Sequence, residues 1–407
     1  MAEPFEKLRA LLAEIVPGNC FQTARLAAAG VDAGVANLAD FSARMPFTTK
    51  AELVADQAAH PPYGTNLTHP VERYSRFCQT SGTTARPLVI LDTAESWDWL
   101  LGNWAHIYRA AGLVAGDRIY FAFSFGPFLG FWTAFEAAAK LGFLCLPGGG
   151  LGSAARLRAM IEQQATVLCC TPTYALHLAE VAGAERIDLS KSAVRKIIVA
   201  GEPGGSVPAV RAKISAAWNG ARVIDHYGMT EVGPVAFQDA DSEGVLRVIE
   251  DSYFAEVIEP GSGAAVAAGV VGELVLTTLG RAACPLLRYR TGDLVKRLAG
   301  EPGFALEGGI IGRADDMVVV RGVNLYPSAV DAVVRAVPEI VEYRVEVSRR
   351  GALTEVALQV EGEQAAAEKL TAALTSAFSL RIPVECVARG TLPRFEMKAR
   401  RWVGVAE

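Results

Sequence analysis

The sequence contains RIYFAF at residues 118–123, FLCL at 143–146, TVLCC at 166–170, KIIVA at 196–200 and RVI at 222–224, five short apolar runs. Helical patterns separate them, and a helix over residues 95–111 precedes the first, with Thr93 as its N-cap and Gly112 just past its end. Alternating strands and helices predict an α/β fold with a mostly parallel, helix-flanked sheet. Ligands of such sheets bind at the carboxyl ends of the strands, where we expect the functional residues.

The pattern changes after residue 232. Short β-rich runs, such as residues 272–278 and 286–289, predict antiparallel strands in a subsidiary barrel or sheet over about residues 232–300. After about Asp315 the pattern predicts a small α+β unit with strands at 317–320, 343–348, 355–361 and near 384–387, and helices at 328–336 and 364–377. We expect a large N-terminal domain of residues 1–314 and a small C-terminal α+β domain of residues 315–407.

Composition excludes several classes of protein. Hydrophobic residues make up 51% and charged residues 20% of the 407-residue chain, which is globular composition rather than disorder. The net charge is −5 and no segment gathers Lys and Arg, so we expect no nucleic-acid partner. No apolar run is long enough to span a membrane, and the first 20 residues lack a signal pattern. We therefore expect a cytoplasmic protein, with its seven cysteines reduced and with Cys169 and Cys170 inside a strand.

Residues 80–87 (TSGTTARP) crowd hydroxyls and glycine ahead of a cation. A loop with free N–H groups and several O–H donors can wrap a phosphate, because it offers many hydrogen bonds to one anion. The spacing is not that of a Walker loop. Taken alone, the segment is better explained as a polar turn between two strands.

Residues 225–231 (DHYGMTE) follow the last apolar run. Tyr227 offers a flat face to a purine, Gly228 allows close approach, Thr230 can bind a phosphate and Glu231 can reach Mg²⁺. The alternative is an ordinary turn at the end of a strand.

Three further motifs are modest when taken singly. Residues 289–293 (YRTGD) place Asp293 after a glycine, where its carboxylate can hold two ribose hydroxyls or cap a β-turn. Residues 311–317 (IGRADDM) and 321–327 (RGVNLYP) fit a hinge or a solvated linker. Residues 392–398 (LPRFEMK) end at Lys398, which alone would be a surface residue.

Together, the order and spacing of these motifs resemble the adenylate-forming superfamily of acyl-CoA synthetases, peptide-synthetase adenylation domains and luciferases. Residues 45–53 (MPFTTKAEL), 321–327 and 390–398 are most similar to its phenylacetate–coenzyme A ligase branch. The likeness runs from about Phe21 to Arg401. It implies that ATP, Mg²⁺ and a carboxylic acid form an acyl-AMP, whose acyl group passes to coenzyme A.

The resemblance also implies roles for individual residues. The phosphate loop would be Thr80, Ser81, Gly82, Thr83, Thr84 and Arg86. The adenine would lie along Gly201, Glu202 and Pro203 and stack on Tyr227, next to Gly228. Thr230 would contact the α-phosphate, Glu231 would hold Mg²⁺, and Asp293, supported by Arg313, would bind the ribose. Asp315 would be the hinge of a mobile C-terminal domain, and Lys398 would bridge the carboxylate and the α-phosphate.

This sequence departs from features found in other members of the superfamily at two places. The phosphate loop has Ala85 and Arg86 where glycine and lysine are usual, which suggests a less mobile loop. Some relatives bind structural zinc after the Tyr-Gly-x-Thr-Glu motif, whereas residues 232–300 contain only Cys284 and no histidine. We therefore expect no zinc.

An aromatic segment, residues 123–132 (FSFGPFLGFW), is expected beside the carboxyl edge of the sheet. It could line an aryl pocket, with Phe125, Gly126, Phe131, Gly148 and Gly149 as candidate pocket residues, and the branch resemblance also favours an aryl or arylacetic acid. The alternative is ordinary packing between a strand and a helix.

Three functions compete at this point. The leading one is an acid–CoA ligase. The second is an adenylating enzyme that passes the acyl group to an amine or to the thiol of a carrier protein in natural-product biosynthesis. The third is a non-catalytic nucleotide-binding homologue, disfavoured because Glu231, Asp293 and Lys398 are intact. The partners considered are a small carboxylic acid, a carrier protein and a second copy of the chain in a homodimer.

Overall fold

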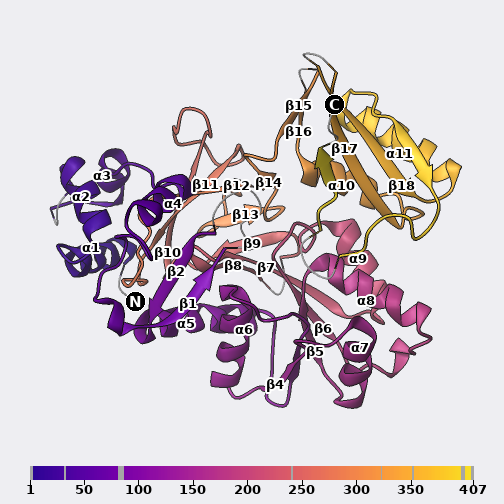
Figure 1. The fold of residues 1–407 in the computed structure, drawn as a ribbon, viewed down its shortest axis with the longest axis horizontal. Coiled ribbons are helices and arrows are strands. Elements are labelled where there is room, and N and C mark those ends of the chain that lie inside the picture. The colour runs from indigo at the N-terminus through magenta and orange to yellow at the C-terminus, as the bar shows by residue number, and fades with distance from the viewer. Residues whose placement is uncertain are drawn as a thin grey trace.

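A computed structural model of the protein describes residues 3–31, 34–80, 87–239, 242–321, 323–350, 353–395 and 399–404. Figure 1 shows a large body built around one long sheet, with the last part of the chain forming a smaller unit beside α8 (Pro172–Ala184) and α9 (Pro208–Ala217). The first helices of the chain lie on the opposite side of the molecule (Figure 1). The expected α/β fold is confirmed.

The central sheet has eight strands in the order β13-β9-β8-β7-β6-β5-β3-β4. Five of them run parallel: β7 (Arg222–Met229), β6 (Lys196–Val199), β5 (Val167–Cys170), β3 (Arg118–Phe121) and β4 (Leu144–Pro147). All five coincide with the apolar runs to within a few residues, and Cys169 and Cys170 are buried in β5, as expected. The antiparallel strands are β8 (Gly233–Gln238), β9 (Val245–Val248) and β13 (Ala305–Glu307).

Helices cover both faces of this sheet. One apolar core joins α5 (Ala94–Ala110) and α6 (Leu129–Lys140) to strand residues such as Ile198, while the other joins α7 (Ser153–Glu162), α8 and α9 to their neighbours such as Ile197. Consecutive side chains of a strand alternate between faces, which explains this division. Helix α5 begins where the sequence predicts, because the Thr93 hydroxyl accepts a hydrogen bond from the Ser96 N–H at 3.3 Å.

Strand β7 corrects one expectation. The sequence places residues 225–229 after the strand, but β7 continues through Met229. It pairs in parallel with β6 only as far as Asp225 and then pairs antiparallel with β8 from His226 onward. New backbone partners in β8 therefore extend the strand beyond its apolar run. Only the end of the motif, Thr230 and Glu231, forms the turn to β8.

A second, antiparallel sheet has the order β10-β11-β12-β14 and comprises β10 (Tyr253–Ile258), β11 (Val271–Thr278), β12 (Tyr289–Lys296) and β14 (Gly312–Arg313). Residues 286–288, expected to be extended strand, precede β12. The β-turn interpretation of residues 289–293 is also wrong, because these residues lie within β12. The register between β11 and β12 shifts at this point, and Gly292 has a φ of +73°. The glycine thus marks an irregularity within a strand rather than a turn.

The beginning of the chain packs against this second sheet. The helices are α1 (Pro4–Ile15), α2 (Cys20–Ala28), α3 (Leu38–Arg44) and α4 (Lys50–Ala59), and the first three share an apolar core with Leu279 and Leu287. An antiparallel hairpin of β1 (Tyr74–Gln79) and β2 (Val89–Thr93) then leads into α5.

The C-terminal unit has an apolar core of its own. It contains the hairpin β15 (Val318–Val320) and β16 (Val323–Leu325), the helices α10 (Pro327–Arg335) and α11 (Gln364–Phe378), and a sheet in the order β19-β18-β17-β20. The strands are β17 (Glu342–Arg350), β18 (Leu353–Glu361), β19 (Val384–Val387) and β20 (Trp402–Gly404). All the elements expected here are present. None of the described helices is long and apolar enough to cross a bilayer.

Candidate active site

Three strands bring together the residues expected around the nucleoside. Tyr227 of β7 donates its hydroxyl to Asp293 Oδ2 at 2.6 Å, and Arg313 Nη1 of β14 donates to Asp293 Oδ1 at 3.2 Å. Burial, and then the charge of Asp293, raises the pKa of Tyr227 well above its ordinary value, so the phenol stays protonated and donates. The carboxylate of Asp293, only 6% exposed, is thus oriented from both sides.

Arg313 also contacts the expected hinge residue. Its Nε and Nη2 donate to the two carboxylate oxygens of Asp315 at 2.9 and 3.2 Å. Partial burial acts to raise the pKa of Asp315, but the hydrogen bond and charge of Arg313 outweigh it, so the pKa lies below its usual value. The geometry needs Gly292, because a Cβ there would lie 2.7 Å from Arg313 Nη2. One guanidinium therefore links Asp293 to Asp315.

Glu231 lies in the turn after β7 and is 5% exposed. Its Oε1 is 3.1 Å from Lys50 Nζ and accepts a 3.4 Å hydrogen bond from the Tyr289 hydroxyl. The buried Arg281 fixes the turn, donating to the Glu231 carbonyl at 2.7 Å. Two hydrogen bonds to Asp92, at 2.7 and 2.5 Å, hold Arg281 in turn. A single carboxylate can hold Mg²⁺, because this ion keeps several water ligands and is commonly bound through only one or two carboxylates.

Lys50 and Arg281 are contacts to which the sequence assigned no role. Lys50 is the first residue of α4, whose N-terminus is fixed by a capping box between Thr49 and Glu52. Thr48 ties the same segment to the start of β12, since its N–H donates to the Arg288 carbonyl at 3.0 Å. Residues 45–53 carry a family resemblance, which is the sequence signal available for Lys50. No sequence signal pointed to Arg281.

The phosphate loop is described only at its base. Ser81, Gly82, Thr83, Thr84, Ala85 and Arg86 lie outside the described residues. Thr80 and Leu88 flank them, and two hydrogen bonds of 3.0 Å join these residues, one between backbones and one from the Leu88 N–H to the Thr80 hydroxyl. The segment therefore connects β1 to β2, which leaves both the phosphate loop and the polar turn open.

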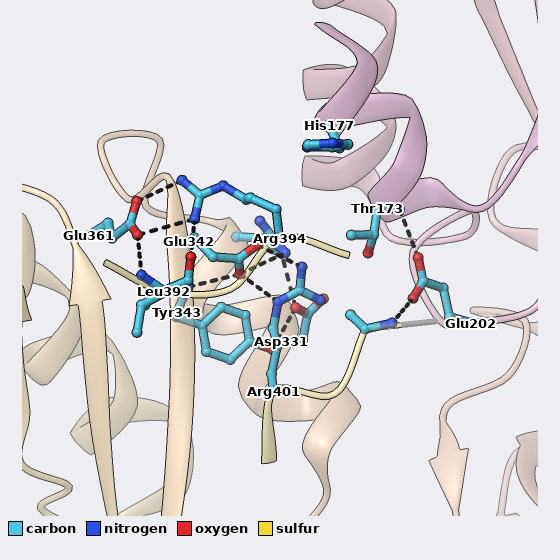
Figure 2. Close-up of polar contacts among 12 residues, drawn as sticks. Thr173, His177, Glu202, Asp331, Glu342, Tyr343, Glu361, Leu392, Arg394 and Arg401 are labelled. Carbon is cyan, nitrogen blue, oxygen red and sulfur yellow. Dashed lines mark hydrogen bonds and ion pairs between the residues drawn. The ribbon is translucent and has the colours of Figure 1, made fainter. Parts of the chain in front are cut away.

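Glu202 faces the C-terminal unit. Its Oε1 accepts a hydrogen bond from the Thr173 N–H at 2.7 Å, and its Oε2 accepts one from the Ala399 N–H at 3.0 Å (Figure 2). The preceding Gly201 has a φ of +91°. Lys398 lies outside the described residues, directly before Ala399 in the chain.

The aromatic segment and the glycine loop lie side by side. Phe123 and Phe131 stack with their ring centroids 4.2 Å apart. Phe125, which has a φ of +60°, lies beside Trp132 with the two ring centroids 5.1 Å apart. The Trp132 indole N–H donates to the Gly126 carbonyl at 2.9 Å. A Cβ on Gly149 would lie 3.3 Å from the Phe125 ring, and one on Gly148 only 2.7 Å from the Tyr120 ring. Phe123 and Phe125 are partly buried against the α5–α6 core, whereas Trp132 is exposed, so both the pocket and the packing interpretation stand.

Comparisons with known proteins bear on this arrangement. The family described as AMP-binding enzyme matches residues 40–282, and the family of AMP-binding enzyme C-terminal domains matches residues 322–404. The chain belongs to the AMP-binding enzyme family. It is an adenylate-forming enzyme of the phenylacetate–coenzyme A ligase-like branch, and the non-catalytic interpretation is set aside. The phenylacetate–coenzyme A ligase of Thermus thermophilus is 33% identical over 365 residues, covering 88% of this chain and 80% of the relative.

This adenylate-forming enzyme also resembles a solved acid–CoA ligase. The crystal structure of 2-hydroxyisobutyryl-CoA ligase in the postadenylation state, in complex with 2-HIB-AMP, matches it with a TM-score of 0.93 at 29% identity, covering 99% of this chain and 89% of the other. The same ligase in the thioesterification state, with 2-HIB-AMP and CoA, matches with a TM-score of 0.74 at 29% identity, covering 98% and 88%. The arrangement of this chain therefore resembles the postadenylation state more than the thioesterification state.

Proposed function

We propose that this protein uses ATP to activate an aryl or arylacetic acid as its acyl-adenylate and then transfers the acyl group to the thiol of coenzyme A. The observation that carries the proposal is the convergence of Tyr227, Asp293 and Arg313 from three strands, close to Glu231. Glu231 follows β7 of the central sheet, and Asp293 comes from β12 of the antiparallel sheet. Two oriented carboxylates brought together in this way suit a nucleotide with its metal. The aromatic segment around Phe125 supports an aryl substrate.

The chemistry proceeds in two steps. A carboxylate oxygen of the acid attacks the α-phosphorus of ATP, the bond from that phosphorus to pyrophosphate breaks, and acyl-AMP forms. The thiol then attacks the acyl carbon, its proton leaves to solvent, and AMP departs with the bridging oxygen.

The residues divide the work as follows. Asp293, aimed by Tyr227 and Arg313, holds the ribose hydroxyls. Glu231 would hold Mg²⁺, which when bound supplies positive charge to the phosphates. By its place in the motif, Lys398 would lie between the acid and the α-phosphate, where a cation stabilises the charge that develops in the transition state. The proposed acceptor is coenzyme A rather than a carrier protein, and the proposed location is the cytoplasm.

Pyrophosphate release across a panel of aromatic and aliphatic acids, with and without coenzyme A, tests the proposal. We expect release that depends on an aryl acid, acyl-AMP without coenzyme A, and acyl-CoA with it. Asp293→Asn should suppress release, whereas Asp239→Asn, in a surface ion pair with Arg247, should behave as wild type. Acyl-AMP consumed only by an amine or a carrier protein would redirect the second step, and no acid-dependent release would refute the first.

A further inference from the structure

Residues 394–399 are tied to the large body of the protein at both ends. At one end, Glu202 accepts the Ala399 N–H with one carboxylate oxygen and the Thr173 N–H, in the first turn of α8, with the other (Figure 2). A carboxylate at a helix N-terminus is stabilised by the helix dipole and by the free N–H groups there. Glu202 thus has a fixed place from which to hold Ala399.

At the other end the tie is an ion pair. Arg394 donates from Nε to Glu180 Oε2 of α8 at 3.1 Å. Its two Nη atoms donate to the two carboxylate oxygens of Glu361 at 3.1 and 2.7 Å (Figure 2). Glu361 is fully buried in the C-terminal unit, whereas Arg394 and Glu180 have side chains 24% and 37% exposed. His177 Nδ1 lies 4.0 Å from Glu180, beyond hydrogen-bonding distance.

This division of contacts matters for the strength of the tie. Glu361 orients the guanidinium within its own unit, so little side-chain entropy is lost when Glu180 engages the remaining Nε. The Glu180 contact itself is partly exposed, and such ion pairs contribute only modestly. A weak, pre-oriented contact suits an arrangement that must form and dissolve during each turnover.

We propose that Glu180 and Glu202 are positioning residues that hold Arg394 and Ala399 against the large body during acyl-AMP formation and release them before the thiol step. The inference rests on the proposed two-step function. It is supported by the arrangement of the chain, which matches the postadenylation state of the 2-hydroxyisobutyryl-CoA ligase better than its thioesterification state. Lys398 stands between Arg394 and Ala399 in the sequence, which connects the proposed positioning to the catalytic role proposed for that lysine.

Glu180→Gln removes the ion pair from a partly exposed position outside the nucleotide site, so the fold should survive. The matched control is Glu185→Gln at the end of the same helix, whose partner Arg158, at 3.2 Å, lies in the same body. Single-turnover acyl-AMP formation and the consumption of supplied acyl-AMP by coenzyme A separate the two steps. We expect Glu180→Gln to slow the first step about two- to fivefold and to leave the second unchanged or faster. Glu185→Gln should change neither.

High salt should reduce the difference in the rate of acyl-AMP formation between wild type and Glu180→Gln, because the Arg394–Glu180 contact is electrostatic and partly exposed. Equal slowing of both steps, or no slowing of the first, would overturn the proposal. Amide hydrogen exchange gives a readout independent of the reaction: peptides covering residues 395–404 should exchange faster in Glu180→Gln than in Glu185→Gln. An unchanged exchange rate in Glu180→Gln would overturn the proposed contact, whichever acceptor the enzyme uses. If the wild-type protein forms no acyl-AMP but these peptides still exchange faster in Glu180→Gln, only the proposed function would be contradicted.

Discussion

Gly292 offers a sharp test of how the ribose carboxylate is organised. Its φ is +73°, and an added Cβ would lie 2.7 Å from Arg313 Nη2 and 3.3 Å from Arg313 Cζ. Gly292→Ala should therefore have two effects. The left-handed backbone should cost about 1–2 kcal/mol of stability, and the displaced guanidinium should lose its hydrogen bond to Asp293.

Gly300→Ala separates the two effects. Gly300 has a φ of +77° but no heavy atom within 4 Å of an added Cβ, so only the backbone cost applies. The lost contact is charge-assisted, but the Arg313 side chain is 40% exposed, so the contribution of the contact is about 1 kcal/mol. That corresponds to about a fivefold fall in kcat/KM for ATP in Gly292→Ala alone.

Thermal unfolding and initial rates of pyrophosphate release at varied ATP concentration measure both quantities. We expect both variants to lose similar stability and only Gly292→Ala to lose kcat/KM for ATP. If both variants keep the wild-type kcat/KM for ATP, Arg313 does not orient Asp293 for ATP binding.

Four other predictions address separate parts of the site. Tyr227→Phe, which deletes a 2.6 Å hydrogen bond to a buried carboxylate, should raise KM for ATP roughly tenfold, and an effect confined to KM for the acid would place Tyr227 elsewhere. EDTA should abolish activity and Mg²⁺ should restore it in wild type but poorly in Glu231→Gln; full rescue of that variant would remove Glu231 from the metal site. Lys398→Ala should slow acyl-AMP formation ~10²–10³-fold in folded protein, and a normal rate would refute its role. Burial raises the pKa of Asp225 to about 7, so between its ordinary pKa of 3.8 and this value the folded state keeps a proton that the unfolded state releases. The contribution of Asp225 to the free energy of unfolding should therefore decrease as the pH rises from about 4 to 7. Urea unfolding at several pH values should show this decrease in wild type and not in Asp225→Asn.

The sequence predicted best what depends on nearby residues. The start of α5 follows from Thr93, a local cap, and the parallel strands follow from apolar runs between helices. The extension of β7 through Met229 could not be predicted, because it depends on backbone partners in β8 rather than on its own side chains. The same holds for Gly292, whose strand irregularity is set by pairing with β11.

Contacts between residues far apart in the sequence could not be predicted from the motifs. Lys50 reaches Glu231 only because α4 is fixed against β12, and Glu202 meets Ala399 across 197 positions. No periodicity encodes either distance. The roles of Lys398 and of residues 81–86 rest on the motif resemblance alone, since these residues lie outside the part of the chain that the structure describes.

The central claim, activation through an acyl-adenylate, is tested most directly by following oxygen atoms. The protein is incubated with ATP, coenzyme A and an arylacetic acid that carries ¹⁸O in both carboxylate positions, and the AMP product is analysed by mass spectrometry. Attack by the carboxylate on the α-phosphorus, followed by cleavage between the acyl carbon and the bridging oxygen, predicts AMP with one heavy oxygen and acyl-CoA that retains the other. Unlabelled AMP formed together with acyl-CoA would contradict the account, because the acid's oxygen would then never have been bonded to the α-phosphorus.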